Sequence, residues 1–363
     1  MPASTTGKVL VTGANGFIAG WIIKDLLEQG FIVRGTVRSL EKAEGLRKAL
    51  SAHGDRLEIF VVEDIAESGA FDKAVEGIDA IVHAASPVHV LANDPEELIR
   101  PALQGTTSIL RSASQPDSTV KRIVVISSLA AIVDISAPTP VTFTEANWNE
   151  HDVAEVRDKG AAAAQSAKYR ASKALAERAA WDLFREGRDK GTIGWDLVTL
   201  CPPWVFGPVL GVQSPNDLHS SVKTWYEIAV KEEGEIPAWS KAYAGFLSAI
   251  GSTSGILKSM CRNWVDVRDF AAATRLAITK PEAGGERFVV CTAPFDWGQW
   301  VYVARRVLGK SKPEEDIQDF SQIVHDVRFD NKKSREVLGI TYHEDMEGTA
   351  AFMIQDFKEK GWC

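Results

Sequence analysis

Strand–helix alternation is the feature of this sequence that most restricts its fold. Apolar runs without polar alternation predict strands covered on both faces, and stretches with helical spacing follow them. The predicted strands cover residues 8–12, 31–37, 57–62, 79–85, 122–127 and 195–201, and the predicted helices include 16–30, 41–54, 95–113 and about 168–185. Alternation of this kind predicts an α/β fold with a parallel, doubly wound sheet.

The first predicted strand runs into TGANGFIAG, which places Gly13 and Gly16 between a strand and a helix. In a Rossmann-type fold, such glycines permit a tight turn and a close approach to a pyrophosphate, whose charge the helix N-terminus stabilises. Ala19 is small enough for the helix to pack on the strand. Glycines also simply cap turns, but the flanking strand and helix favour dinucleotide binding. The contacts predicted here are Gly13, Asn15, Gly16, Phe17 and Ile18.

The end of the second predicted strand indicates which dinucleotide is bound. Binders of NAD carry an acidic residue there for the ribose hydroxyls. This sequence instead has Arg38, with Lys42 in the next turn. A guanidinium can pair bidentately with a ribose 2′-phosphate, although Arg38 could also be a solvated surface residue. We therefore predict that the cofactor is NADP (NADPH).

Two further strand ends offer cofactor contacts. Asp64 follows the third strand, where it could hold the adenine amino group or equally cap the next segment. Small residues follow the fourth strand and leave room for a cofactor across the strand ends. The contacts predicted at these ends are Asp64, Ile65, Ala84, Ala85 and Ser86.

The predicted chemical centre combines a strand-end serine with Tyr169 and Lys173. Residues four apart share a helix face, so a phenol and an ammonium are presented together. The ammonium is expected to lower the tyrosine pKa toward the working range, and a serine hydroxyl can bond a substrate carbonyl oxygen. Chance spacing, with the tyrosine stacked on a lysine stem, is the alternative. Ser127 and Ser128 both stand at the strand end, and adjacent strand residues face opposite ways.

These motifs resemble a known family. TGANGFIAG, the VVISS strand end, YRASK and CPPWVFGP resemble the extended short-chain dehydrogenase/reductases. The segments DIAESGAFDKAVEGIDAIVHAASPV, EANWNE and TAPFDW narrow the resemblance to yeast and fungal NADPH-dependent aldehyde/ketone (carbonyl) reductases, relatives of plant dihydroflavonol and cinnamoyl-CoA reductases. It covers roughly residues 8–310.

The resemblance implies reduction of an aldehyde or ketone by NADPH to give an alcohol. It selects Ser128 as the serine that polarises the carbonyl, with Tyr169 as general acid and Lys173 tuning it, and makes Ser127 a cofactor-side neighbour. It also implies that Pro202 and Val205 lie beside the nicotinamide. One departure is Ser108, where the family has an asparagine.

A smaller, discontinuous C-terminal lobe is predicted to bind the substrate. The cofactor domain would comprise residues 1–207 and 259–280, and the substrate lobe residues 208–258 and 281–363. The long segment 232–258 is a candidate lid or pocket wall. Aromatic content favours an apolar pocket for bulky or aryl ketones and keto esters. The predicted substrate contacts are Ser128, Pro203, Trp204, Phe206, Trp225 and Tyr226.

Composition excludes other classes of protein. A net charge of −8 argues against binding to nucleic acid or to an anionic membrane surface, and no apolar run is long enough for a membrane span. Four scattered cysteines indicate a reduced, cytoplasmic protein, and no metal site is predicted. A monomer or a homodimer is expected. The alternatives are a sugar-nucleotide epimerase, a dihydroflavonol or cinnamoyl-CoA-type reductase, a steroid-type dehydrogenase, and a non-catalytic NADP-sensing regulator.

Overall fold

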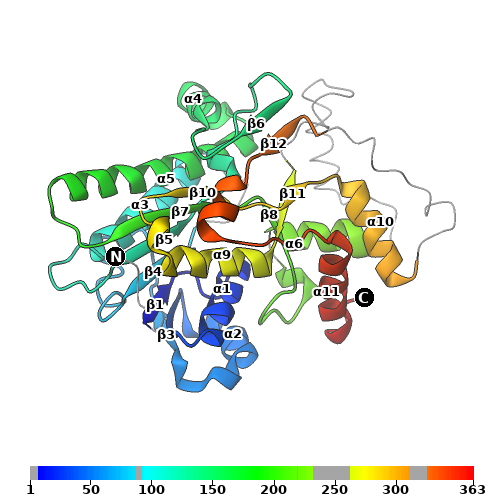
Figure 1. Ribbon diagram of the computed structural model, residues 1–363, viewed down its shortest axis with the longest axis horizontal. Helices are drawn as coiled ribbons and strands as arrows, with labels where there is room; N and C mark the ends of the chain where they lie inside the picture. Colours follow the sequence, from blue (N-terminus) through cyan, green and yellow to red (C-terminus); the bar gives the residue numbers. More distant parts are fainter. Residues whose placement is uncertain (1–6, 87–91, 219, 232–261, 311–324) are drawn as a thin grey trace.

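A parallel sheet forms the centre of the molecule (Figure 1). The structure is a computed structural model that describes residues 7–86, 92–218, 220–231, 262–310 and 325–363. Seven strands lie in the order β10-β7-β5-β4-β1-β2-β3, and every pairing is parallel. The strands are β1 (Lys8–Val11), β2 (Ile32–Val37), β3 (Leu57–Val61), β4 (Ala80–His83), β5 (Arg122–Ile126), β7 (Asp196–Cys201) and β10 (Arg287–Val289). This order confirms the predicted fold class.

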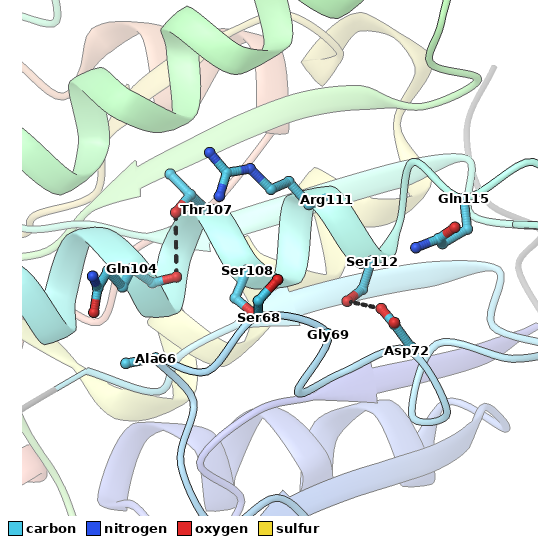
Figure 2. A pocket seen from close by; sticks show the side chains of 10 residues that line it. All are labelled: Ala66, Ser68, Gly69, Asp72, Gln104, Thr107, Ser108, Arg111, Ser112 and Gln115. Carbon is cyan, nitrogen blue, oxygen red and sulfur yellow. Dashed lines mark hydrogen bonds between the residues drawn. The ribbon is translucent and has the colours of Figure 1, made fainter.

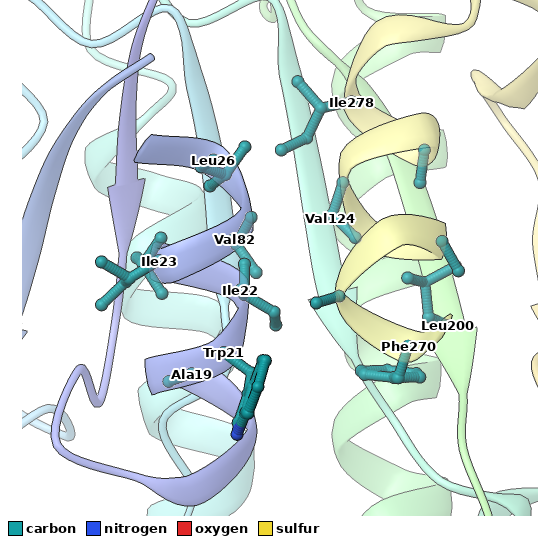
Figure 3. Close-up of a cluster of buried hydrophobic side chains, with 14 of the residues drawn as sticks. Ala19, Trp21, Ile22, Ile23, Leu26, Val82, Val124, Leu200, Phe270 and Ile278 are labelled. Carbon is teal, nitrogen blue, oxygen red and sulfur yellow. The ribbon is translucent and has the colours of Figure 1, made fainter. Parts of the chain in front are cut away.

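Helices cover both faces of the sheet because successive strand residues point to opposite sides. In β1, Val9 and Val11 enter the core beneath α1 (Phe17–Glu28) and α9 (Val267–Thr279), whereas Leu10 enters the core beneath α3 and α5. Figure 3 shows α1 and α9 side by side over the first of these cores. Helices α3 (Glu96–Ser112) and α5 (Gln165–Asp189) pack together over the other face. Both faces are therefore buried, as the unbroken apolar runs predict.

Two smaller sheets accompany the main sheet (Figure 1). A three-stranded sheet has the order β11-β9-β8, and β6 pairs with β12. Aromatic side chains fill the core between these strands and the helices near the C-terminus. The bounds are α2 (Glu44–Ala49), β6 (Val141–Phe143), α4 (Glu150–Lys159), β8 (Trp204–Phe206), α6 (Ser220–Trp225), β9 (Asn263–Asp266), β11 (Ala293–Pro294), α10 (Trp297–Leu308), β12 (Val327–Phe329) and α11 (Met346–Glu359).

The lobe boundaries remain a prediction, with one correction. Strand β10 was assigned to the substrate lobe, but it pairs with β7 at the edge of the main sheet. Phe288 and Val289 are fully buried, so this short strand completes the cofactor-domain core. Segment 232–258 lies outside the described residues.

A buried ion pair joins β5 and β7 at their N-terminal ends. The Arg122 guanidinium donates to both carboxylate oxygens of Asp196, at 2.6 and 2.7 Å, and also to the Ala277 carbonyl at 3.0 Å. The pair therefore ties two central strands to the end of α9. Among the described residues, no helix is long and apolar enough to cross a bilayer.

Candidate active site

Most predicted site residues follow strands that end at one edge of the sheet, and Tyr169 and Lys173 lie on α5. Because β1, β4, β5 and β7 run parallel, the segments after them lie side by side. The backbone N–H of Ser127 donates to the Leu200 carbonyl at 2.8 Å, and that of Leu129 donates to the Pro202 carbonyl at 2.9 Å. The serine pair and the predicted nicotinamide wall are thus joined through the backbone.

The glycine turn has the geometry that a dinucleotide requires. Gly13 has a φ of +68°, and a Cβ there would lie 3.1 Å from the Cα of Ala85. Gly16 is the N-cap of α1, whose first N–H groups have no partner inside the helix. Asn15 and Gly16 are exposed, and Phe17 and Ile18 are partly exposed. The turn can therefore present N–H groups to a phosphate.

Thr12 and His83 stabilise this turn, and the sequence analysis missed both. The Thr12 hydroxyl accepts from the N–H groups of Ala84 and Ala85, at 3.1 and 3.0 Å. With both lone pairs used, its proton must go to Nδ1 of His83, 3.0 Å away. Burial lowers the pKa of His83 to about 3, which agrees with this neutral tautomer. The network fixes the segment after β4 against the glycine turn.

Tyr169 and Lys173 lie one turn apart on α5 and contact groups from two strand ends. Tyr169 lies near Ser128, which lowers the tyrosine pKa, and the Lys173 ammonium donates to the Ser86 hydroxyl at 3.1 Å. Ser128 also accepts from the backbone N–H of Ala130 at 3.1 Å. The three residues proposed for catalysis thus come from α5 and from the segment after β5.

Electrostatics at this site differ from the sequence-based expectation. Burial raises the pKa of Tyr169, while the hydrogen bond with Ser128 lowers it, so the predicted net fall is wrong. Burial also lowers the pKa of Lys173 to about 8. Tyr169 therefore remains a protonated phenol at neutral pH, which is the form that donates a proton.

The two strand-end serines face opposite ways, as their register predicts. Ser127 is buried and its hydroxyl donates to Glu177 at 2.6 Å, so its side chain points away from the Tyr169 contact. Ser128 is partly exposed and bonds Tyr169. This arrangement supports Ser128 as the substrate-side serine, and any cofactor contact of Ser127 would be through its backbone.

The remaining predicted cofactor residues lie along the same edge. Arg38 directly follows β2 and is exposed, as is Lys42. The Asp64 carboxylate accepts from the N–H of Ala66 at 2.8 Å, which is the capping role left open in the sequence analysis. Ile65 packs against α3, where a Cβ on Gly105 would lie 2.8 Å from its side chain.

The predicted substrate residues do not all reach a surface. Phe206 and Trp225 are fully buried and pack on Trp300, with ring centroids 4.9 and 5.9 Å away. Both rings are core residues in the described structure, and their burial argues against the predicted substrate contacts. The Tyr226 hydroxyl donates to the Trp362 carbonyl at 2.8 Å, near the C-terminus.

Trp204 remains the best placed of these aromatic residues. Pro203 and Trp204 are partly exposed and directly follow Pro202, whereas Val205 is buried in the core beneath α1 and α9. Trp297 lies edge-on to Trp204, with ring centroids 5.5 Å apart. Sequence reasoning missed Trp297, although it is part of the TAPFDW motif.

A polar pocket of about 410 Å³ lies between α3 and the segment that follows β3 (Figure 2). It lies beyond Asp64 and Ile65 and contains none of the residues proposed for catalysis. Ser112 donates to Asp72 across it at 2.6 Å, and Ser108 donates to the Glu67 carbonyl at 2.8 Å. The hydroxyl of Ser108, which departs from the family pattern, is therefore used in joining α3 to the loop.

The fold and the glycine turn together define the class of protein. A model of the NAD-dependent epimerase/dehydratase family matches residues 9–291. The chain belongs to this family, which confirms the predicted relationship.

Individual relatives match nearly the whole chain. It is 36% identical to ketoreductase azaE of Aspergillus niger, over 94% of this chain and 95% of the relative. It is 30% identical to the NADPH-dependent methylglyoxal reductase GRE2 of Saccharomyces cerevisiae, over 96% and 98% of the two chains. The crystal structure of yeast Gre2, a methylglyoxal/isovaleraldehyde reductase complexed with NADPH, has a TM-score of 0.79 and 29% identity, covering 98% of this chain and all of that one.

Proposed function

We propose that this protein is an NADPH-dependent carbonyl reductase that converts an aldehyde or ketone to an alcohol. The observation that carries the proposal is the meeting of Tyr169 with Ser128 at the sheet edge, with Lys173 one helical turn beyond Tyr169. The two curated relatives are both named as reductases, and they match at least 94% of the chain. The partly exposed rings of Trp204 and Trp297 favour bulky or aryl ketones and keto esters over small polar substrates.

The cofactor fits the groups at the sheet edge. The close approach of Gly13 to Ala85 and the open N-terminus of α1 suit a pyrophosphate. Exposed Arg38 suits a 2′-phosphate, and the Lys173 ammonium, which donates to Ser86 after β4, suits ribose hydroxyls. When bound, NADPH supplies the hydride that adds to the carbonyl carbon.

The chain's own residues supply positioning and the proton. Ser128 donates a hydrogen bond to the substrate oxygen and keeps the carbonyl polarised. Tyr169 donates its phenolic proton to that oxygen as negative charge develops there, and solvent later replaces the proton. Lys173, as an ammonium, stabilises the tyrosinate that forms.

Gly13→Ala tests the cofactor turn. Alanine at a φ of +68° is strained, and its Cβ would meet the Ala85 backbone, so the turn must shift. We expect NADPH affinity, measured by fluorescence titration, to fall roughly tenfold, equivalent to about 1.4 kcal/mol. Gly77→Ala is the matched control, because Gly77 has the same φ with nothing near its Cβ position. Equal affinity losses in both variants would contradict a local role for Gly13.

The reductase function is tested by cofactor oxidation with a panel of aryl ketones, β-keto esters, aldehydes and a dihydroflavonol. Nicotinamide absorbance should fall with NADPH and at least one carbonyl, and less with NADH. Binding of NADPH without any reduction would favour the sensor. A redox-neutral change in a sugar nucleotide would favour the epimerase. Strongest turnover of the dihydroflavonol would favour the plant-type reductases.

Cytoplasmic location and a monomeric or homodimeric state also remain proposals. Cys201, Cys291 and Cys363 are free thiols, which suits a reducing compartment. Gel filtration with light scattering would determine the oligomeric state.

A further inference from the structure

A buried carboxylate lies one turn beyond Lys173 on α5. Glu177 is 1% exposed, and its two oxygens accept four strong hydrogen bonds. Oε1 accepts from Thr199 at 2.8 Å and from the Arg287 Nε at 2.7 Å. Oε2 accepts from Ser127 at 2.6 Å and from the Arg287 Nη2 at 3.0 Å. One side chain thus joins the catalytic helix to β5, β7 and β10.

The Arg287 guanidinium also makes contacts with the segment that precedes α4. Its Nη1 donates to the carbonyls of Glu145 and Asn147, at 2.9 and 2.5 Å. Its guanidinium lies over the ring of Trp148, 3.8 Å from the centroid. Buried ion pairs of this kind add little to stability compared with a well-packed apolar core. The Glu177–Arg287 pair lies beside the proposed catalytic residues, so we looked for a role in the reaction.

We propose that Glu177 is a positioning residue for the reaction: its buried carboxylate fixes the end of β5 through Ser127 and holds a negative charge one helical turn from Lys173. The inference rests on the reductase function proposed above. Ser127 immediately precedes Ser128, so holding Ser127 sets the direction in which Ser128 leaves the strand. Because Glu177 is buried, it acts on the site through its neighbours.

The charges around Lys173 support this role. The Glu177 carboxylate raises the pKa of Lys173, opposing the burial that lowers it to about 8. On β4, His83 is neutral, and on β7 burial raises the pKa of Cys201, which keeps its thiol neutral. The remaining groups facing the site are the phenol of Tyr169, the hydroxyl of Ser86 and the Arg287 cation beyond Glu177. Loss of the Glu177 charge must therefore favour the neutral amine.

Glu177→Gln tests the proposal by removing charge with little change of shape. The pKa of Lys173 is read by competitive acetylation across a pH series, with the Lys173 peptide quantified by mass spectrometry. We expect the midpoint of Lys173 labelling to fall by about one pH unit. In the same variant, carbonyl reduction should decline at a correspondingly lower pH as the pH is raised.

Two further variants separate positioning from general stability. Asp196→Asn breaks the Arg122 pair at the opposite ends of the same strands, so it should lower the unfolding temperature without moving the labelling midpoint. Glu177→Gln combined with Arg287→Met leaves no unpaired buried charge, which guards against failure to fold. It should still show a lowered midpoint.

An unchanged midpoint in both Glu177 variants, or an equal shift in Asp196→Asn, would overturn the proposal. The labelling needs neither cofactor nor substrate. Failure of the reductase function would appear separately, as a wild-type protein with the expected Lys173 titration that reduces no carbonyl.

Discussion

Tyr169→Phe should abolish carbonyl reduction while NADPH binding stays nearly intact. The substitution removes the phenolic proton and keeps the ring, so the packing of α5 is preserved. Loss of a general acid lowers kcat by about 10²- to 10⁴-fold. Turnover is measured from nicotinamide absorbance at saturating ketone, and NADPH affinity from fluorescence titration.

A matched control exists for this variant. Tyr342 is a buried tyrosine whose hydroxyl lies 2.8 Å from that of Ser334. Tyr342→Phe should reduce stability modestly and leave kcat unchanged. If Tyr169→Phe retained substantial turnover, another group would have to supply the proton and the assignment would be wrong.

Arg38→Ala should move the cofactor preference from NADPH toward NADH. Arg38 is exposed directly after β2, where it can make charge-assisted hydrogen bonds to a 2′-phosphate that NADH lacks. Such bonds contribute roughly 1.5–3 kcal/mol, so kcat/KM for NADPH should fall about 10- to 100-fold. The value for NADH should change little.

Arg47→Ala is the control for this measurement, because it removes the same charge from an exposed site on nearby α2. It should preserve the ratio of NADPH to NADH efficiency. An unchanged ratio in Arg38→Ala would mean that the 2′-phosphate is held by other residues, with Lys42 the first to examine.

Much of the fold could be predicted because its signal is local. A strand such as β1 is buried on both faces, so Val9, Leu10 and Val11 form an unbroken apolar run that can be read from the sequence. Strand β10 was placed in the wrong lobe because it has only three residues and pairs with β7, about 90 positions earlier in the chain. Local pattern carries no information about such a partner.

Aromatic residues were the weakest basis for the candidate site. Aromatic residues such as Trp225 and Phe206 occur in pocket walls, but large rings pack equally well in a hydrophobic core. Both of these rings are fully buried. The sign of the Tyr169 pKa shift was missed for a related reason: burial acts more strongly here than neighbouring groups, and sequence does not give burial depth.

The supporting polar residues could have been found from position alone. Thr12 and Thr199 are polar residues within or directly after apolar runs, and Glu177 shares a helix face with Lys173. Polar groups at core positions need partners, so each is a signal of a network. The identity of the partners, such as Arg287, depends on tertiary structure.

Hydride transfer itself is the most direct test of the account. NADPH carrying deuterium at C4 of the nicotinamide would be incubated with the protein and a ketone from the panel that the protein reduces. The alcohol product would then be analysed by mass spectrometry. We expect one deuterium on the carbinol carbon with wild-type protein, and at least about 100-fold less labelled alcohol with Tyr169→Phe over the same time. The experiment is run with deuterium on one face of the nicotinamide ring and then with deuterium on the other. If the alcohol contained no deuterium in either case, direct hydride transfer and the reductase mechanism would be contradicted.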